Sequence, residues 1–226
     1  MVRSLVTAVL LVASVGCAAG TRDNATPNLA AEGMSAYQGI ISQLASRSRL
    51  DDDPVLLERL APIFRRLIQA AGRSYPGSRD WAWELHVTSD PAFSAFCILG
   101  GKVLVGSRFV QQLKLDDDEL AMLLAHEMSH ALAGHLRERA PQGGMEDNLA
   151  WENHESAIAL RQESEADRLG LSLARDAGFP VAGLLGFFDK LAAAEPAGTF
   201  SSTHPSARTR AAQVRAWAAA RETGPK

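Results

Sequence analysis

The stretch HEMSHALAGH, residues 126–135, holds three histidines and one glutamate, which is half of the six histidines in the chain. Residues four apart lie on one face of a helix. His126 and His130 can therefore direct both imidazoles at a single ion. Glu127 is one position further on and can reach a water molecule bound to that ion.

This HExxH spacing is the signature of a zinc metalloprotease site, with two histidine ligands and a glutamate as general base. Such a site needs a third protein ligand and an open position for water. His135 is one candidate, but on a continuous helix it is turned about 140° from His130. We therefore expect His135 to be a packing or surface residue.

A better third ligand lies downstream in ESEAD, residues 163–167. Glu163 and Asp167 are four apart and share a helical face. We expect Glu163 to bind the metal and Asp167 to accept a hydrogen bond from a ligand imidazole, which would fix its tautomer. Glu165 is about 200° from Glu163 around the helix and should point elsewhere.

The helix that carries the motif has a strong start signal. Asp116 can cap it, with Glu119 three residues on as a capping box. The cluster Asp116–Asp118 also suits the positive end of a helix, so it does not require a calcium ion. We expect this helix over residues 116–136.

The rest of the chain predicts a mainly helical α+β protein. Two apolar runs around Gly100-Gly101 indicate a β-hairpin. Residues 137–152 and the segment PAGTFSSTH indicate loops. Further helices are expected over 29–49, 54–73, 153–177, 180–194 and 205–222.

Composition narrows the class of protein. The 226 residues carry a formal net charge of -3, and only 6% are aromatic. No basic stripe or base-stacking platform is visible, so a nucleic-acid partner is not expected. Cys97 lies in an apolar run, and we expect a buried thiol rather than a nucleophile.

Residues 1–17 have the layout of a signal peptide, with a basic residue, a short apolar run and small residues. Cys17 follows Gly16 as in a bacterial lipobox, so lipidation of Cys17 is expected, with an ordinary cleaved signal as the alternative. Residues 18–28 are small and polar and indicate a tether. The predicted division is therefore leader 1–17, tether 18–28 and peptidase domain 29–226.

Three motifs occur in order: HExxH followed by His135, then ExEAD, then STHPSARTR at residues 202–210. This combination resembles peptidase family forty-eight of the zinc metallopeptidases, the family of HtpX, BepA and the CAAX prenyl protease. The resemblance runs from about Trp83 to Ala212. It implies a zincin-like gluzincin fold, with His126, His130 and Glu163 on one Zn²⁺ per chain.

The resemblance also implies how substrate binds. An extended peptide would pair with an edge strand at Lys102–Gly106, where main-chain hydrogen bonds give affinity without much sequence choice. The family often has Asn-Ala-Phe before its hairpin, whereas this chain has Ser94-Ala95-Phe96. That departure weakens any carry-over of a substrate contact to Ser94.

Two further residues of the third motif match the family pattern. His204 follows a Gly-Thr-Phe-Ser-Ser stretch, and three roles are open for it. It can pack at a helix start, gate the zinc, or stabilise the oxyanion of the intermediate. Arg210 is a second candidate for the gate or oxyanion role.

The expected function is that of a zinc metalloendopeptidase that cleaves misfolded or unassembled cell-envelope proteins. Its partners would be unfolded or extended polypeptides and, through the lipid anchor, a bacterial membrane. The expected location is the periplasmic side of that membrane, as an outer-membrane lipoprotein. The alternative is a chaperone-like envelope assembly factor whose peptidase site is normally closed. An aminopeptidase is disfavoured because the sequence shows no acidic motif for a substrate N-terminus.

Overall fold

The computed structural model describes residues 25–135, 148–195 and 206–222, and the structural statements below concern these residues. Cys17 and His204 lie outside the described residues, as does nearly all of the predicted leader and tether. The division into leader, tether and domain therefore stays a prediction.

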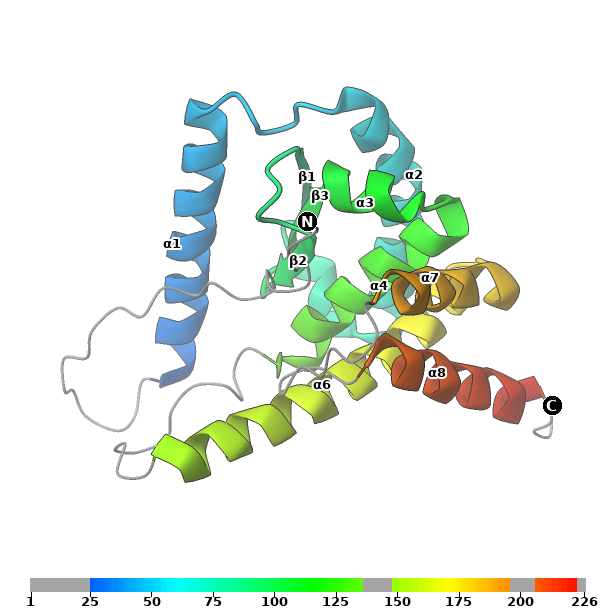
Figure 1. Ribbon diagram of the computed structural model, residues 1–226. Coiled ribbons are helices and arrows are strands. Elements are labelled where there is room, and N and C mark those ends of the chain that lie inside the picture. Colours follow the sequence, from blue (N-terminus) through cyan, green and yellow to red (C-terminus); the bar gives the residue numbers. More distant parts are fainter. Residues whose placement is uncertain (1–24, 136–147, 196–205, 223–226) are drawn as a thin grey trace.

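The described chain is mainly helical, with one three-stranded sheet (Figure 1). The elements in chain order are α1 Ala25–Ser46, α2 Pro54–Ser74, the 3₁₀ helix η1 Pro76–Asp80, β1 Glu84–Thr88, β2 Ala95–Ile98, β3 Lys102–Gly106, α3 Ser107–Leu113, α4 Asp117–Ala133, α6 Asn148–Asp176, α7 Val181–Ala194 and α8 Ala207–Glu222. The α+β class with a small sheet beside the motif helix is thus confirmed.

The strands are arranged in the order β1-β3-β2, with β1 parallel and β2 antiparallel to β3. The predicted hairpin of β2 and β3 is confirmed, and its turn has positive φ at both Gly100 (91°) and Gly101 (81°). Two glycines suit that turn because they adopt positive φ without steric cost.

The expectation that Lys102–Gly106 forms an edge strand was wrong. This segment is β3, which is paired on both sides and has no free backbone groups for a further strand. The local sequence could not show this, because the parallel partner β1 joins β3 across an intervening hairpin strand. Among the described residues, β2 and β1 are the two outer strands of the sheet.

The core lies between the sheet and helices α2 and α4. One face of the sheet contributes Val87, Val103 and Val105, which are fully buried. Helix α2 contributes an apolar stripe, and α4 is buried on almost every side, with Met122 and Met128 fully enclosed. Each such side chain contributes about 1.5–3 kcal/mol on burial, so the motif helix is held rigidly at the centre.

The start of α4 agrees with its predicted cap. Asp116 accepts from the Glu119 backbone N–H at 3.0 Å, and Glu119 accepts from the Asp116 N–H at 2.7 Å. The capping box is therefore confirmed, and it accounts for the acidic cluster without a metal. The helix ends at Ala133, because Gly134 adopts the left-handed conformation with φ 74°.

Helix α6 crosses α4 closely at the motif. A Cβ on Gly170 would lie 2.9 Å from the backbone nitrogen of His126, so only glycine allows this approach. At the far end of α6, Arg73 donates to the Asp176 carbonyl at 2.8 Å and Arg66 to the Ala177 carbonyl at 3.0 Å. These arginines satisfy carbonyls at the C-terminal end of α6, which have no partner within the helix.

Helix α1 lies on the opposite face of the sheet from α4, to one side of the molecule (Figure 1). Tyr37 and Leu44 on α1 are both buried. The Tyr37 hydroxyl donates to Glu84 at 2.8 Å, and its ring meets Phe96 edge-on.

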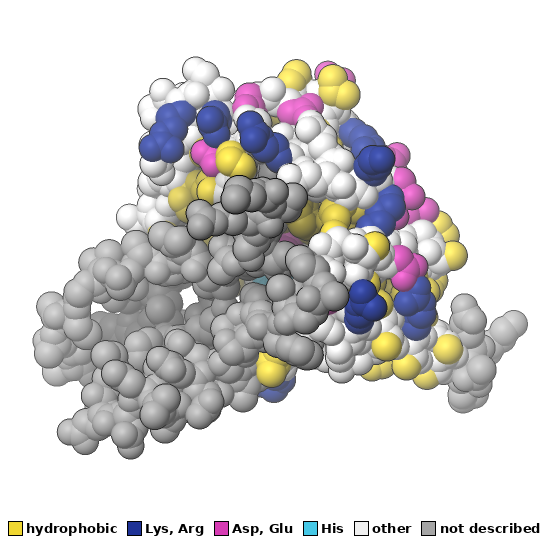
Figure 2. Space-filling model, in the orientation of Figure 1, with side chains coloured by type: hydrophobic (Ala, Val, Ile, Leu, Met, Phe, Trp, Pro, Cys, Tyr) yellow, Lys and Arg dark blue, Asp and Glu magenta, His cyan; other side chains and the backbone are white. Residues whose placement is uncertain are grey.

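None of the described helices is both long and apolar enough to cross a membrane. Basic and acidic side chains are interspersed over the described part of the face in Figure 2.

Candidate active site

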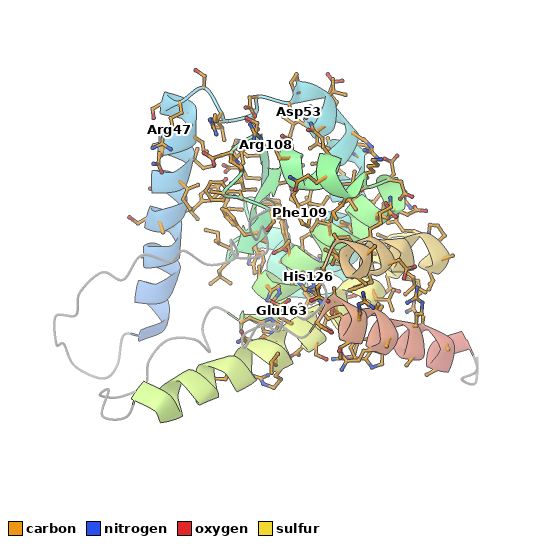
Figure 3. The ribbon with its side chains drawn as sticks, in the orientation of Figure 1. Arg47, Asp53, Arg108, Phe109, His126 and Glu163 are labelled. Atoms are coloured by element: carbon orange, nitrogen blue, oxygen red, sulfur yellow. The ribbon has the colours of Figure 1, made fainter. Side chains whose placement is uncertain are left out.

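The predicted ligands come together where α4 meets α6. Figure 3 shows His126 and Glu163 beside one another at this junction. His126 and His130 lie one turn apart on α4, and Glu163 reaches them from α6. His126 and Glu163 are buried, and His130 is partly exposed. The structure thus brings together the three residues that the sequence selected as ligands.

The spacing of the donor atoms can be compared with that of a tetrahedral zinc site. The Nε2 atoms of His126 and His130 are 3.2 Å apart. Glu163 Oε2 is 3.5 Å from His126 Nε2, and Oε1 is 3.4 Å from His130 Nε2. A tetrahedron with zinc–ligand distances of about 2.0–2.1 Å has donors about 3.3 Å apart. The donor set and its spacing therefore fit zinc, and these three form a group able to hold a metal ion.

Glu127 lies on the same helix, beside the cluster but not part of it. Burial raises the pKa of Glu127 to about 7, and the nearby charge of Glu163 acts in the same direction, while His126 and Arg210 oppose it. A carboxyl with a pKa near neutral is well matched to accept and return a proton at neutral pH.

Asp167 contacts His126 as expected. It is fully buried, and its Oδ1 lies 2.9 Å from His126 Nδ1. A ligating Nε2 of His126 must offer a lone pair, so the hydrogen of the neutral ring is on Nδ1, where the Asp167 carboxylate accepts it.

Arg210 occupies a position that the sequence did not predict. Its Nε donates to Asp167 Oδ2 at 2.8 Å and its Nη2 to Oδ1 at 2.6 Å, a two-pronged contact from α8 to α6. Burial alone would raise the pKa of Asp167, but the charge and hydrogen bonds of Arg210 lower it. Arg210 thus keeps Asp167 ionised. The residues are 43 positions apart, so no local signal could have paired them.

The other candidates from the sequence lie outside the group of metal ligands. Glu165 points away from the cluster, toward His135 at 3.5 Å, as its helical phase predicted. His135 is buried and is not in the group able to hold a metal. Cys97 is a buried thiol, as predicted, and burial raises its pKa well above the usual range. The gating and oxyanion roles of His204 stay predictions.

The fold and the site define the class as a metallopeptidase of the HExxH type. A family model described as Peptidase family M48 matches residues 55–160 and 154–218. The chain belongs to Peptidase family M48, so the resemblance noted in the sequence is confirmed. The predicted metalloendopeptidase class is confirmed at the level of this family.

Individual relatives carry the same class in their names. The mitochondrial metalloendopeptidase OMA1 of Schizosaccharomyces pombe is 29% identical over 80% of this chain and 58% of its own length. The OMA1 protein of Arabidopsis thaliana is 31% identical over 57% of this chain and 30% of its own. The beta-barrel assembly-enhancing protease of Yersinia pestis is 26% identical over 76% of this chain and 40% of its own. The chain thus spans 58% of the length of the first of these relatives and less than half of the length of the other two.

The expected location on the periplasmic side of a bacterial outer membrane was wrong. Relatives from Schizosaccharomyces pombe, Arabidopsis thaliana and Saccharomyces cerevisiae are mitochondrial metalloendopeptidases, although beta-barrel assembly-enhancing proteases also match. The expectation depended on residues 1–17 alone. A short apolar run with small residues does not distinguish one membrane system from another.

We expect Arg210→Ala to destabilise the protein by about 3–5 kcal/mol, because it leaves the Asp167 carboxylate buried without its cationic partner. Urea unfolding of the metal-free protein measures this. Arg215→Ala is a matched control on the same helix, since Arg215 pairs with Asp189 at the surface and should cost at most about 1 kcal/mol. Equal effects of the two variants would contradict a stabilising role for the buried pair.

Proposed function

We propose that this chain is a zinc-dependent metalloendopeptidase with a zincin-like, gluzincin arrangement. One Zn²⁺ per chain would be held by His126, His130 and Glu163, and the substrates would be misfolded or unassembled proteins. The observation that carries the proposal is the set of three donors 3.2–3.5 Å apart, with Glu127 next to His126 on the same buried helix.

The protein groups have distinct tasks in this reaction. When bound, zinc supplies a Lewis acid that activates water and polarises the scissile carbonyl. Glu127 takes the proton of the attacking water and later returns it to the leaving amine. Asp167 and Arg210 hold the His126 ring in one orientation. Glu127 itself is half-buried on α4.

Substrate binding is proposed at the outer edge of β2. The backbone N–H of Gly106 donates to the Ser94 carbonyl. In an antiparallel pair, residues whose backbone groups face the partner strand alternate with residues whose groups face outward, so this bond shows which residues of β2 face outward. It follows that the N–H and C=O groups of Ala95 and Cys97 point away from β3. Because β2 packs against α4, a peptide added to this edge would run past the HExxH helix.

Strand addition selects for extended chains. In a folded segment the backbone N–H and C=O groups are already hydrogen-bonded to each other. In an unfolded segment they are free to form hydrogen bonds with the outward backbone groups of β2. This supports misfolded or unassembled proteins as the substrate class. The name of the Yersinia pestis relative, a protease that enhances beta-barrel assembly, is compatible with such substrates.

The rival function is a chaperone-like assembly factor that binds the same chains without cutting them. The position of Glu127 favours the enzyme, because a binder has no use for a carboxyl beside two metal ligands that does not itself belong to the ligand group. Both functions require the edge of β2, so only a test of bond cleavage separates them.

The deciding experiment incubates the purified full chain with reduced, unfolded casein, with and without 1,10-phenanthroline. We expect cleavage at internal peptide bonds, loss of cleavage with the chelator and recovery when Zn²⁺ is restored. Capture of casein without cleavage, at one zinc per chain, would favour the chaperone-like function and overturn the enzymatic one.

The edge of β2 can be tested separately. We expect Ala95→Pro to raise KM for an extended peptide about fivefold, because it removes one outward donor worth about 1 kcal/mol. The bonds to β3 should survive, since this N–H is not used in the ladder. Ala95→Gly keeps the N–H and serves as the control. An unchanged KM in the proline variant would exclude this edge as the binding site.

A further inference from the structure

His130 has a histidine neighbour on the side away from the cluster. Its Nε2 faces His126 at 3.2 Å, while its Nδ1 lies 3.0 Å from Nδ1 of His135. The two rings meet edge-on, with centroids 4.9 Å apart. His135 is 2% exposed, so this contact is made inside the protein and not through solvent.

The sequence did not predict this contact because the helix ends between the two histidines. On an unbroken helix His135 would be turned about 140° away from His130. Gly134, however, adopts the left-handed conformation with φ 74° and ends the helix. The next residue, His135, therefore does not follow the helical path. The side-chain amide of Gln162, on α6, then donates to the His135 carbonyl at 3.0 Å.

The direction of the hydrogen bonds follows from the chemistry of imidazole. A ligating Nε2 of His130 must offer a lone pair, so the hydrogen of the neutral ring is on Nδ1. That Nδ1–H can donate only if Nδ1 of His135 accepts. His135 then carries its own hydrogen on Nε2, which faces Glu165 Oε2 at 3.5 Å.

We propose that His135 is a positioning residue for the metal site: it accepts from His130 and fixes that ring with Nε2 toward the ion. His126 has Asp167 in the same role, so each ligand imidazole has its own partner. The inference rests on the proposed zinc site.

The test compares variants of His135 that keep or remove a hydrogen-bond acceptor for Nδ1–H of His130. In His135→Asn the amide oxygen can take the position of Nδ1, whereas His135→Leu has no acceptor. We expect the leucine variant to bind Zn²⁺ about 10–100-fold more weakly and the asparagine variant to stay within about threefold of the wild type. Zinc affinity is measured by competition with a chromophoric chelator, without reference to proteolysis.

A spectroscopic reading separates orientation from packing. With Co²⁺ in place of Zn²⁺, the visible absorption bands should shift in His135→Leu and be restored in His135→Asn. Circular dichroism of the metal-free proteins checks folding. If His135→Leu does not fold, His135→Gln replaces it, because its amide reaches the position of Nε2 and not that of Nδ1.

The outcomes are distinct. Equal zinc affinities and equal cobalt spectra in all variants would overturn the positioning role, as would equal weakening in the asparagine and leucine variants. Failure of the wild-type chain to bind zinc at all would instead overturn the proposed function. Tight zinc binding by the wild type, with no effect of His135, would leave that function intact and remove this inference alone.

Discussion

Glu127→Gln should keep close to one zinc per chain and lose peptide hydrolysis by a factor of about 10²–10⁴. The amide has the shape of the carboxylate but cannot take a proton from the attacking water. Because Glu127 is outside the group able to hold the metal, its replacement should leave the metal affinity nearly unchanged. The measurement is kcat/KM on a quenched fluorescent peptide, with metal content determined on the same sample.

The control is Glu165→Gln, which makes the same chemical change on the neighbouring helix, away from the cluster. It should retain most of the activity. Hydrolysis by Glu127→Gln within about tenfold of the wild type would remove Glu127 from the role of general base. Loss of zinc together with activity would place it among the ligands instead.

Glu163→Ala should weaken zinc binding by at least an order of magnitude, because three protein ligands become two. Glu165→Ala should change it by no more than about threefold, since Glu165 is 35% exposed and contacts His135 and not the cluster. Equilibrium dialysis against a zinc buffer measures both. The opposite ranking would mean that α6 presents a different face to α4 in solution.

The parts of the structure that depend on near neighbours could be predicted from the sequence. The capping box of Asp116 and Glu119, the Gly100-Gly101 turn and the pairing of His126 with His130 each involve residues within four positions. These features fixed the motif helix and the hairpin. The shared face of Glu163 and Asp167 was visible for the same reason.

The parts that depend on tertiary contacts could not be predicted. The central position of β3 results from pairing with β1, and the contact of Arg210 with Asp167 joins α8 to α6.

Helix α3, Ser107–Leu113, was missed because two turns show too little apolar periodicity to be recognised. Residues 148–152 are helical where a loop was expected, and α1 begins at Ala25 inside the expected tether.

The most direct test of the central claim is anomalous X-ray diffraction at the zinc absorption edge, on crystals grown with Zn²⁺. We predict one anomalous peak per chain, about 2.0–2.2 Å from Nε2 of His126, Nε2 of His130 and a carboxylate oxygen of Glu163. A peak bound elsewhere, or none at these three residues, would contradict it.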